Sequence, residues 1–200
     1  MSEFWNQKYR NPDYFYGTQP NQLLQSQIWR LPAGARILVL GDGEGRNGVW
    51  LAERGFNVVS VDFSQTGCEK AAKLAAERGV QLEIICADLL AWSWPQAAFD
   101  AVVIVYLHFL PEARAQIYPQ AVTALVPGGL FITELFHPRQ LEYSSGGPKD
   151  EQMLITPQDL AASLTTLRWL LLTEGNVWLD EGPGHQGAAH VTQAVGQRVH

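Results

Sequence analysis

Blocks of hydrophobic positions recur at regular intervals from about residue 35 onward. Short, almost wholly apolar runs are separated there by stretches with helical spacing. The apolar runs predict five strands, at 36–40, 57–61, 81–86, 99–105 and 129–135. Helices are predicted between them at 46–54, 65–78 and 112–125. Apolar strands separated by helices are typical of a parallel sheet covered on both faces.

The C-terminal part predicts a different ending for this sheet. A helix near 157–166 precedes two further strands, near 168–180 and 187–199. The connection at 180–187 is rich in glycine and resembles a hairpin, which would make the last strand antiparallel. We therefore expect an α/β, doubly wound, Rossmann-like fold with a mostly parallel seven-stranded sheet and an antiparallel last strand.

The first part of the chain has another character. Residues 1–34 are rich in aromatic and polar side chains and lack strand alternation, so they predict one or two short helices and a loop. We divide the chain into an aromatic arm over 1–34 and an α/β domain over 35–200. We expect the arm to cover the ligand-binding site of that domain.

Composition narrows the classes of function. The chain is 46% hydrophobic with a formal net charge of −6, and its basic residues are scattered, so a nucleic-acid partner is not expected. Cys68 and Cys86 have no CxxC spacing and predict neither a disulfide framework nor a metal site. The N-terminal sequence has no signal-peptide profile, and no apolar run reaches the ~18 residues of a membrane span. A cytoplasmic protein without membrane segments is the expectation.

A glycine-rich turn ends the first predicted strand. The sequence Gly41-Asp42-Gly43-Glu44-Gly45 leads directly into a helix, so a ligand can approach bare backbone and unpaired helix amides. The dinucleotide fingerprint GxGxxG would need a third glycine where Arg46 stands, which weakens an NAD site. No GK[ST] follows, so the turn is not a P-loop.

Two acidic residues follow the next two strands. Asp62 ends one strand and could accept both hydroxyls of a ribose, while Asp88 follows the other and could accept from an adenine amino group. Each aspartate could instead be a helix N-cap, and the turn could be a plain connection. All three features fall at the carboxyl edge of one sheet, which favours a nucleoside ligand.

These motifs resemble the class I S-adenosylmethionine-dependent methyltransferases over about residues 35–135. The resemblance implies that Gly41, Gly43 and Gly45 hold the methionine part, Asp62 the ribose and Asp88 the adenine. It also implies further cofactor-binding residues, namely Phe63 and Leu89 around the adenine and Val105 at the fourth strand tip. Independently of the resemblance, Tyr16 in the aromatic arm could offer its ring face to the sulfonium, or it could fasten the arm to the domain. Val39 stands where the family often has an acidic residue, which leaves Asp42 or Glu44 to contact the methionine amine.

Further motifs resemble a subgroup of small-molecule methyltransferases that includes tellurite-resistance and thiopurine S-methyltransferase-like enzymes. They are Trp5…Tyr9…Tyr16-Gly17…Pro20-Asn21, the helix start at 43–52 and the hairpin at 181–187. The resemblance implies methyl transfer to a small molecule, either a thiol or a chalcogen oxyanion. The tellurite-type enzymes have a His-Arg pair near the final hairpin, whereas here Gln186 follows His185.

Histidines are the candidates for acid–base chemistry. His108 and His137 follow the fourth and fifth strands, and His185 lies in the hairpin, all at the ligand edge. Each could equally be a hydrogen-bonded loop or capping residue. The (N/D)PP(Y/F) motif of nucleic-acid amino methyltransferases and a Pro-Cys loop are absent, so the acceptor is expected to be a small molecule.

The sequence leaves other questions open. The protein could be a monomer or a homodimer. Its function could also be that of an NAD-dependent oxidoreductase or of a non-catalytic S-adenosylmethionine-binding regulatory module.

Overall fold

A computed structural model describes residues 2–199, so residues 1 and 200 of the predicted arm and domain lie outside it. The strands are β1 (Arg36–Leu40), β2 (Asn57–Asp62), β3 (Glu83–Cys86), β4 (Phe99–Val105), β5 (Leu125–Phe136), β6 (Leu167–Asp180) and β7 (Gln186–Arg198). The α-helices are α1 (Ser2–Lys8), α2 (Gln22–Gln27), α3 (Arg46–Glu53), α4 (Gln65–Glu77), α5 (Pro111–Ala124) and α6 (Pro157–Ser163). Short 3-10 helices are η1 (Ile28–Arg30), η2 (Pro138–Glu142) and η3 (Glu151–Met153).

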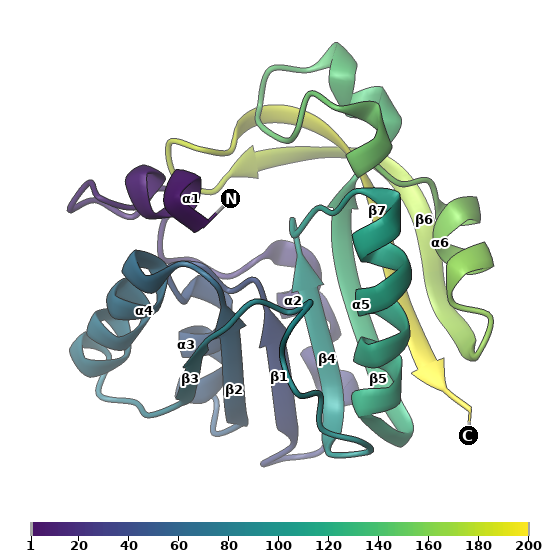
Figure 1. Cartoon of the computed structure of the whole chain (residues 1–200), viewed down its shortest axis with the longest axis horizontal. Coiled ribbons are helices and arrows are strands. Elements are labelled where there is room, and N and C mark those ends of the chain that lie inside the picture. The colour runs from purple at the N-terminus through teal and green to yellow at the C-terminus, as the bar shows by residue number, and fades with distance from the viewer. Residues whose placement is uncertain (1, 200) are drawn as a thin grey trace.

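The strands form one seven-stranded sheet in the order β3-β2-β1-β4-β5-β7-β6. The pairs from β3 to β5 are parallel, and β7 is antiparallel to both β5 and β6. The predicted fold class is therefore confirmed, including the antiparallel last strand. Figure 1 shows β6 and β7 curving over the upper edge of the sheet toward α1.

The apolar strands are buried on both faces, as their composition predicts. Along β1, Leu38 and Leu40 pack in the core with α5 and α6, whereas Ile37 and Val39 pack in the core with α2 and α3. Burial of each such side chain contributes about 1.5–3 kcal/mol, so both faces of the sheet hold the helices in place.

Three predicted boundaries were wrong by two residues or more, and the others lie within one residue of those in the structure. Strand β5 begins at Leu125 rather than 129, because pairing with β4 already starts at Phe99 and Leu125. Strand β3 begins at Glu83 rather than 81. Helix α6 ends at Ser163 rather than 166, because Leu164 leaves the helix and packs in the core just before β6.

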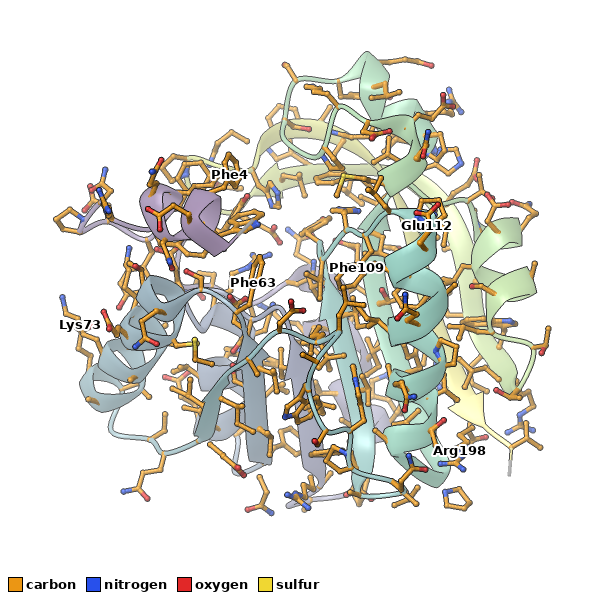
Figure 2. The ribbon with its side chains drawn as sticks, in the orientation of Figure 1. Phe4, Phe63, Lys73, Phe109, Glu112 and Arg198 are labelled. Carbon is orange, nitrogen blue, oxygen red and sulfur yellow. The ribbon has the colours of Figure 1, made fainter. Side chains whose placement is uncertain are left out.

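Parallel strands place their carboxyl ends at one edge of the sheet, which is the upper edge in Figure 1. In Figure 2, Phe63 lies at the end of β2 on this edge, below α1. The glycine turn after β1 and the end of β4 belong to the same edge because both strands pair in register with one another. The glycine turn and the ends of β2 and β4 therefore lie together at one edge of the sheet.

Candidate active site

The glycine turn connects β1 to α3 through left-handed backbone. Gly41, Gly43 and Gly45 have φ angles of 63°, 58° and 88°, which favour glycine. Gly45 is the N-cap of α3, and a Cβ there would lie 2.7 Å from the Cβ of Ala71 on α4. Gly45 therefore allows two helices to pack, while Gly41 and Gly43 face the cavity described below.

Asp62 is fixed at the end of β2 by two backbone amides. Its Oδ2 accepts a hydrogen bond from the Gly43 N–H at 2.9 Å, and its Oδ1 accepts from the Ser64 N–H at 2.8 Å. The N-cap of α4 is Ser64, so Asp62 does not have that capping role. Burial raises the pKa of Asp62. Each carboxylate oxygen keeps further acceptor capacity at the cavity wall, which suits the hydroxyls of a ribose.

Asp88 and Leu89 do not line the cavity that is described below. Asp88 is exposed, and its Oδ1 accepts a hydrogen bond from the Leu90 N–H at 2.9 Å in a local turn. Leu89 is buried in the core with Val61 and Ile104. The roles predicted for Asp88 and Leu89 at the adenine therefore stay predictions.

Both acidic residues of the glycine turn already have polar partners within the chain. Asp42 accepts hydrogen bonds from the Ser60 hydroxyl and the Gly48 N–H, and burial raises its pKa to about 6. Glu44 forms a buried ion pair with Lys70, and its Oε2 accepts from the Phe15 N–H at 2.7 Å. Asp42 thus stabilises the turn from inside, and Glu44 holds the arm.

A cavity that is partly open to solvent lies over the turn. Of the predicted cofactor-binding residues, its lining includes Tyr16, Gly41, Asp42, Gly43, Asp62, Phe63 and Val105. It also includes residues outside that predicted set, namely Trp5, Tyr9, Gly17, Glu44, Arg46, Asn47, Tyr106 and Leu107, together with His185. Aromatic rings therefore form much of the wall.

The arm closes this cavity by meeting both the turn and the hairpin. A Cβ on Gly43 would lie 2.8 Å from the hydroxyl oxygen of Tyr9, so the arm lies directly on the turn. The Gly184 N–H donates to the Phe15 carbonyl at 2.9 Å. A Cβ on Gly182 would lie only 2.4 Å from the nitrogen of Gly17, so the hairpin backbone packs on the arm without side chains between.

A buried charged cluster connects α3 to the hairpin. Glu181 lies 3.0 Å from the Arg46 guanidinium and 3.1 Å from Nδ1 of His185. These two partners hold the pKa of Glu181 at about 2 despite its burial. Burial lowers the pKa of His185. His185 is therefore neutral at pH 7, with its proton on Nδ1 facing the carboxylate and a lone pair on Nε2.

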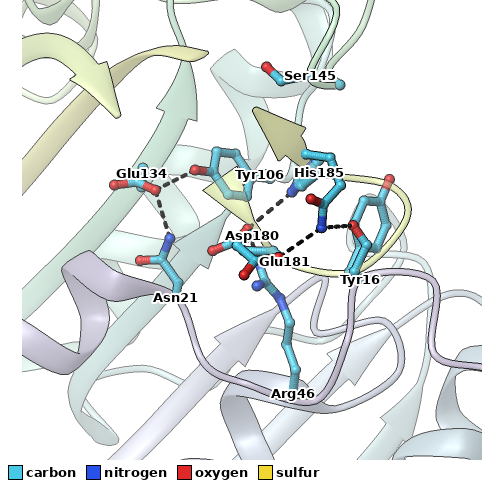
Figure 3. A network of polar contacts seen from close by, with 12 residues as sticks. Tyr16, Asn21, Arg46, Tyr106, Glu134, Ser145, Asp180, Glu181 and His185 are labelled. Carbon is cyan, nitrogen blue, oxygen red and sulfur yellow. Dashed lines mark hydrogen bonds and ion pairs between the residues drawn. The ribbon is translucent and has the colours of Figure 1, made fainter. Parts of the chain in front are cut away.

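Tyr106 places an aromatic ring beside His185. Its φ of 51° is unusual for a bulky residue, and such backbone strain often marks functional positions. The hydroxyl donates to buried Glu134, which also accepts from Asn21 at 2.7 Å, as Figure 3 shows. The Tyr106 and His185 ring centroids are 4.6 Å apart, so this network fixes one wall of the cavity.

Among the three candidate histidines, only His185 lines the cavity. His108 is not part of the lining; it is half-buried and stacked on Phe136, and burial lowers its pKa to about 3. His137 caps η2 by accepting from the Arg139 N–H, and its Nε2 lies 3.0 Å from a carboxylate oxygen of Glu174. Of the three candidate histidines, the structure therefore brings only His185 to the cavity.

Comparisons with known proteins point to methyltransferases. Residues 37–129 match the family described as a methyltransferase domain. The chain is 31% identical over 178 residues to a thiopurine S-methyltransferase of Bordetella petrii, covering 76% of this chain and 79% of that protein. It is 34% identical over 110 residues to a demethylmenaquinone methyltransferase of Thermus thermophilus, covering 53% of this chain and about half, 49%, of that protein. A SAM-dependent methyltransferase structure from Methanosarcina mazei superposes with a TM-score of 0.72 at 17% identity, covering 90% of this chain and 99% of that one.

The chain belongs to the class I S-adenosylmethionine-dependent methyltransferases, and S-adenosylmethionine is its cofactor. This assignment replaces the alternatives of an NAD-dependent oxidoreductase and a non-catalytic binding module. No helix within residues 2–199 combines the length and apolar character that crossing a membrane requires.

Proposed function

We propose that this enzyme transfers a methyl group from S-adenosylmethionine to the sulfur of a small aromatic thiol. The observation that carries the proposal is His185, held neutral beside Glu181 between two aromatic rings of the cavity wall. Its ring centroid lies 4.5 Å from that of Tyr16 and 4.6 Å from that of Tyr106. A planar acceptor fits among such rings, and His185 can take its proton.

The cavity residues suit the cofactor. Gly41 and Gly43 offer bare backbone, Asp62 offers acceptors for ribose hydroxyls, and Phe63 offers a ring face for adenine. When bound, the cofactor supplies an electrophilic methyl group on a sulfonium. The rings of Tyr9 and Tyr16 line the same cavity and would favour that positive charge.

His185 acts in this proposal as the base for the acceptor. The ionised Glu181 keeps the ring proton on Nδ1, so Nε2 accepts the thiol proton and leaves a thiolate as the nucleophile. After methyl transfer, the proton on Nε2 passes to solvent. A thiol needs only this help because thiols are far more acidic than alcohols: even the thiol of free cysteine has a pKa of about 8.5, and an aromatic ring makes a thiol more acidic still.

The charge of the wall favours a thiol over an oxyanion such as tellurite. Arg46 is the one Lys or Arg among the described lining residues, and Glu181 neutralises it at 3.0 Å. Gln186 stands in place of the arginine that the tellurite-type pair would need. The thiopurine S-methyltransferase relatives, which by name act on sulfur of a heteroaromatic compound, support the same choice.

A panel assay tests the proposal by measuring S-adenosylhomocysteine formation with aromatic thiols, aliphatic thiols, selenite, tellurite, phenols and amines. We expect the highest kcat/KM with aromatic thiols. His185→Gln should lower kcat by about 10²–10⁴ for thiols that are protonated at pH 7. The loss should vanish for thiols acidic enough to be ionised already.

His108→Gln is the matched control, because this histidine does not line the cavity. Its substitution should leave the dependence of kcat on thiol pKa unchanged. Turnover restricted to oxygen, nitrogen or oxyanion acceptors would contradict the proposal. An equal loss across all thiols in His185→Gln would also contradict it, because a base matters only for protonated acceptors.

A further inference from the structure

Three side chains outside the cavity converge where β5, β6 and β7 meet. They are His137, which follows β5, Glu174 in the middle of β6 and His190 on β7. Nε2 of His137 lies 3.0 Å from one Glu174 oxygen, and Nε2 of His190 lies 3.8 Å from the other. We propose that these residues bind a divalent transition-metal ion, with Zn²⁺ as the ion that fits best.

The ligand set and its spacing suit zinc. Two imidazole nitrogens and one carboxylate leave a fourth position for water, an arrangement that zinc accepts. Bonds of about 2.0–2.2 Å place tetrahedral ligand atoms roughly 3.3 Å apart. The three ligand atoms here all lie within 4.8 Å of one another, so small side-chain rotations close the site.

His190 is already in the tautomer that binds a metal. Its Nδ1 lies 2.7 Å from Oδ1 of Asn176 and therefore carries the proton, which leaves a lone pair on Nε2. That Nε2 is buried and has no hydrogen-bond partner among the described residues. A buried nitrogen without a partner is unfavourable, and a metal ion would satisfy it. Asn176 is then the outer partner that orients the ligand.

His137 must change its tautomer when the ion binds. Its Nδ1 accepts from the Arg139 N–H at 3.1 Å, so its proton is on Nε2 and is donated to Glu174. Coordination through Nε2 moves this proton to Nδ1 and opens the bond from Arg139. The side chain of Glu174 is 38% exposed, which gives the ion and its water a path from solvent.

The ion would join three elements that carry the active-site hairpin. His137 and His190 are adjacent, with ring centroids 4.9 Å apart, and Glu174 is on the paired strand. Figure 1 shows that β6 and β7 continue from the sheet toward α1. The connection between Asp180 and Gln186 contains His185. None of the three proposed metal ligands lines the cavity, so the proposed metal site is separate from the site of methyl transfer.

The experiment is titration of the metal-free, tag-free full chain with ZnCl₂ by calorimetry, and with CoCl₂ by visible absorption. We expect one ion per chain and a tetrahedral Co²⁺ spectrum. Glu174→Gln and His190→Gln should abolish both signals, and Asn176→Ala should weaken binding by about 10- to 100-fold. Asp180→Asn, which removes an exposed carboxylate from the same strand, is the control and should bind as the wild type does.

Imidazole ¹⁵N spectra give an independent result. In the metal-free chain, His190 should be protonated on Nδ1 and His137 on Nε2. Zn²⁺ should leave His190 in the Nδ1–H form and convert His137 to that form. No Zn²⁺ binding to the folded wild type would overturn the proposal. Unchanged binding in Glu174→Gln would overturn it as well, and this half-exposed position keeps the test valid if His190→Gln does not fold.

Discussion

Replacing Glu181 by glutamine removes the only carboxylate between Arg46 and His185 in the described charged cluster. The pKa of Glu181 falls from its ordinary 4.5 to about 2 in the folded protein. This difference corresponds to about 3 kcal/mol of stabilisation when the group is ionised. Arg46 is also buried, and leaving a buried charge without its partner costs about 3–5 kcal/mol. We therefore expect Glu181→Gln to lower the free energy of unfolding by about 3 kcal/mol at pH 7.

The pH dependence separates this cause from a simple packing defect. Because the folded-state pKa is lowered, the stabilisation is complete above about pH 4.5 and is lost as the pH falls toward 2. The measurement is urea unfolding of wild type and Glu181→Gln from pH 7 down to pH 2, where the difference should shrink.

A double variant supplies the control. Arg46→Met should destabilise the Glu181→Gln chain less than it destabilises the wild type, since the two side chains interact directly at 3.0 Å. A difference below about 1 kcal/mol at pH 7 would refute the reasoning. A difference that is the same at every pH, or fully additive single effects, would refute it too.

Two further predictions concern the carboxyl edge of the sheet. Asp62→Ala should weaken S-adenosylhomocysteine binding by about 10- to 100-fold in calorimetry, since hydrogen bonds to a charged acceptor contribute about 1.5–3 kcal/mol. Exposed Asp88→Ala should weaken it less, and equal losses would contradict the placement of these side chains in the structure. Gly45→Ala should lower the free energy of unfolding by about 3 kcal/mol, because left-handed backbone and crowding against Ala71 add. Gly55→Ala shares the left-handed φ but has open space around it, so a calorimetric loss of about 1 kcal/mol is expected there, and similar losses at both glycines would argue against crowding.

The sheet and its ligand edge could be predicted because they depend on local patterns. Apolar runs such as 36–40 and 99–105 indicate buried strands whatever their partners, and parallel strands bring their ends to one edge. The cluster of Gly41, Gly43 and Asp62 follows from that rule, since each residue lies at or just beyond the end of a strand.

The rest of the site depends on contacts between distant segments, which local patterns do not specify. His108 follows β4 as Tyr106 does, but the chain turns at the left-handed Tyr106, so His108 packs behind Phe136. Asp88 satisfies its carboxylate in a local turn and stays exposed. The convergence of His137 with Glu174 and His190 depends on the register of β6 against β7, so the cysteine-based expectation of no metal site did not consider these residues.

The N-terminal arm has a practical consequence for work with this enzyme. Trp5, Tyr9, Tyr16 and Gly17 belong to the cavity wall although they precede the sheet in the chain. Shortening the protein to its regular α/β part would therefore yield a chain whose ligand site is open on one side. Binding and activity measurements should therefore use a chain that keeps the residues from Trp5 onward.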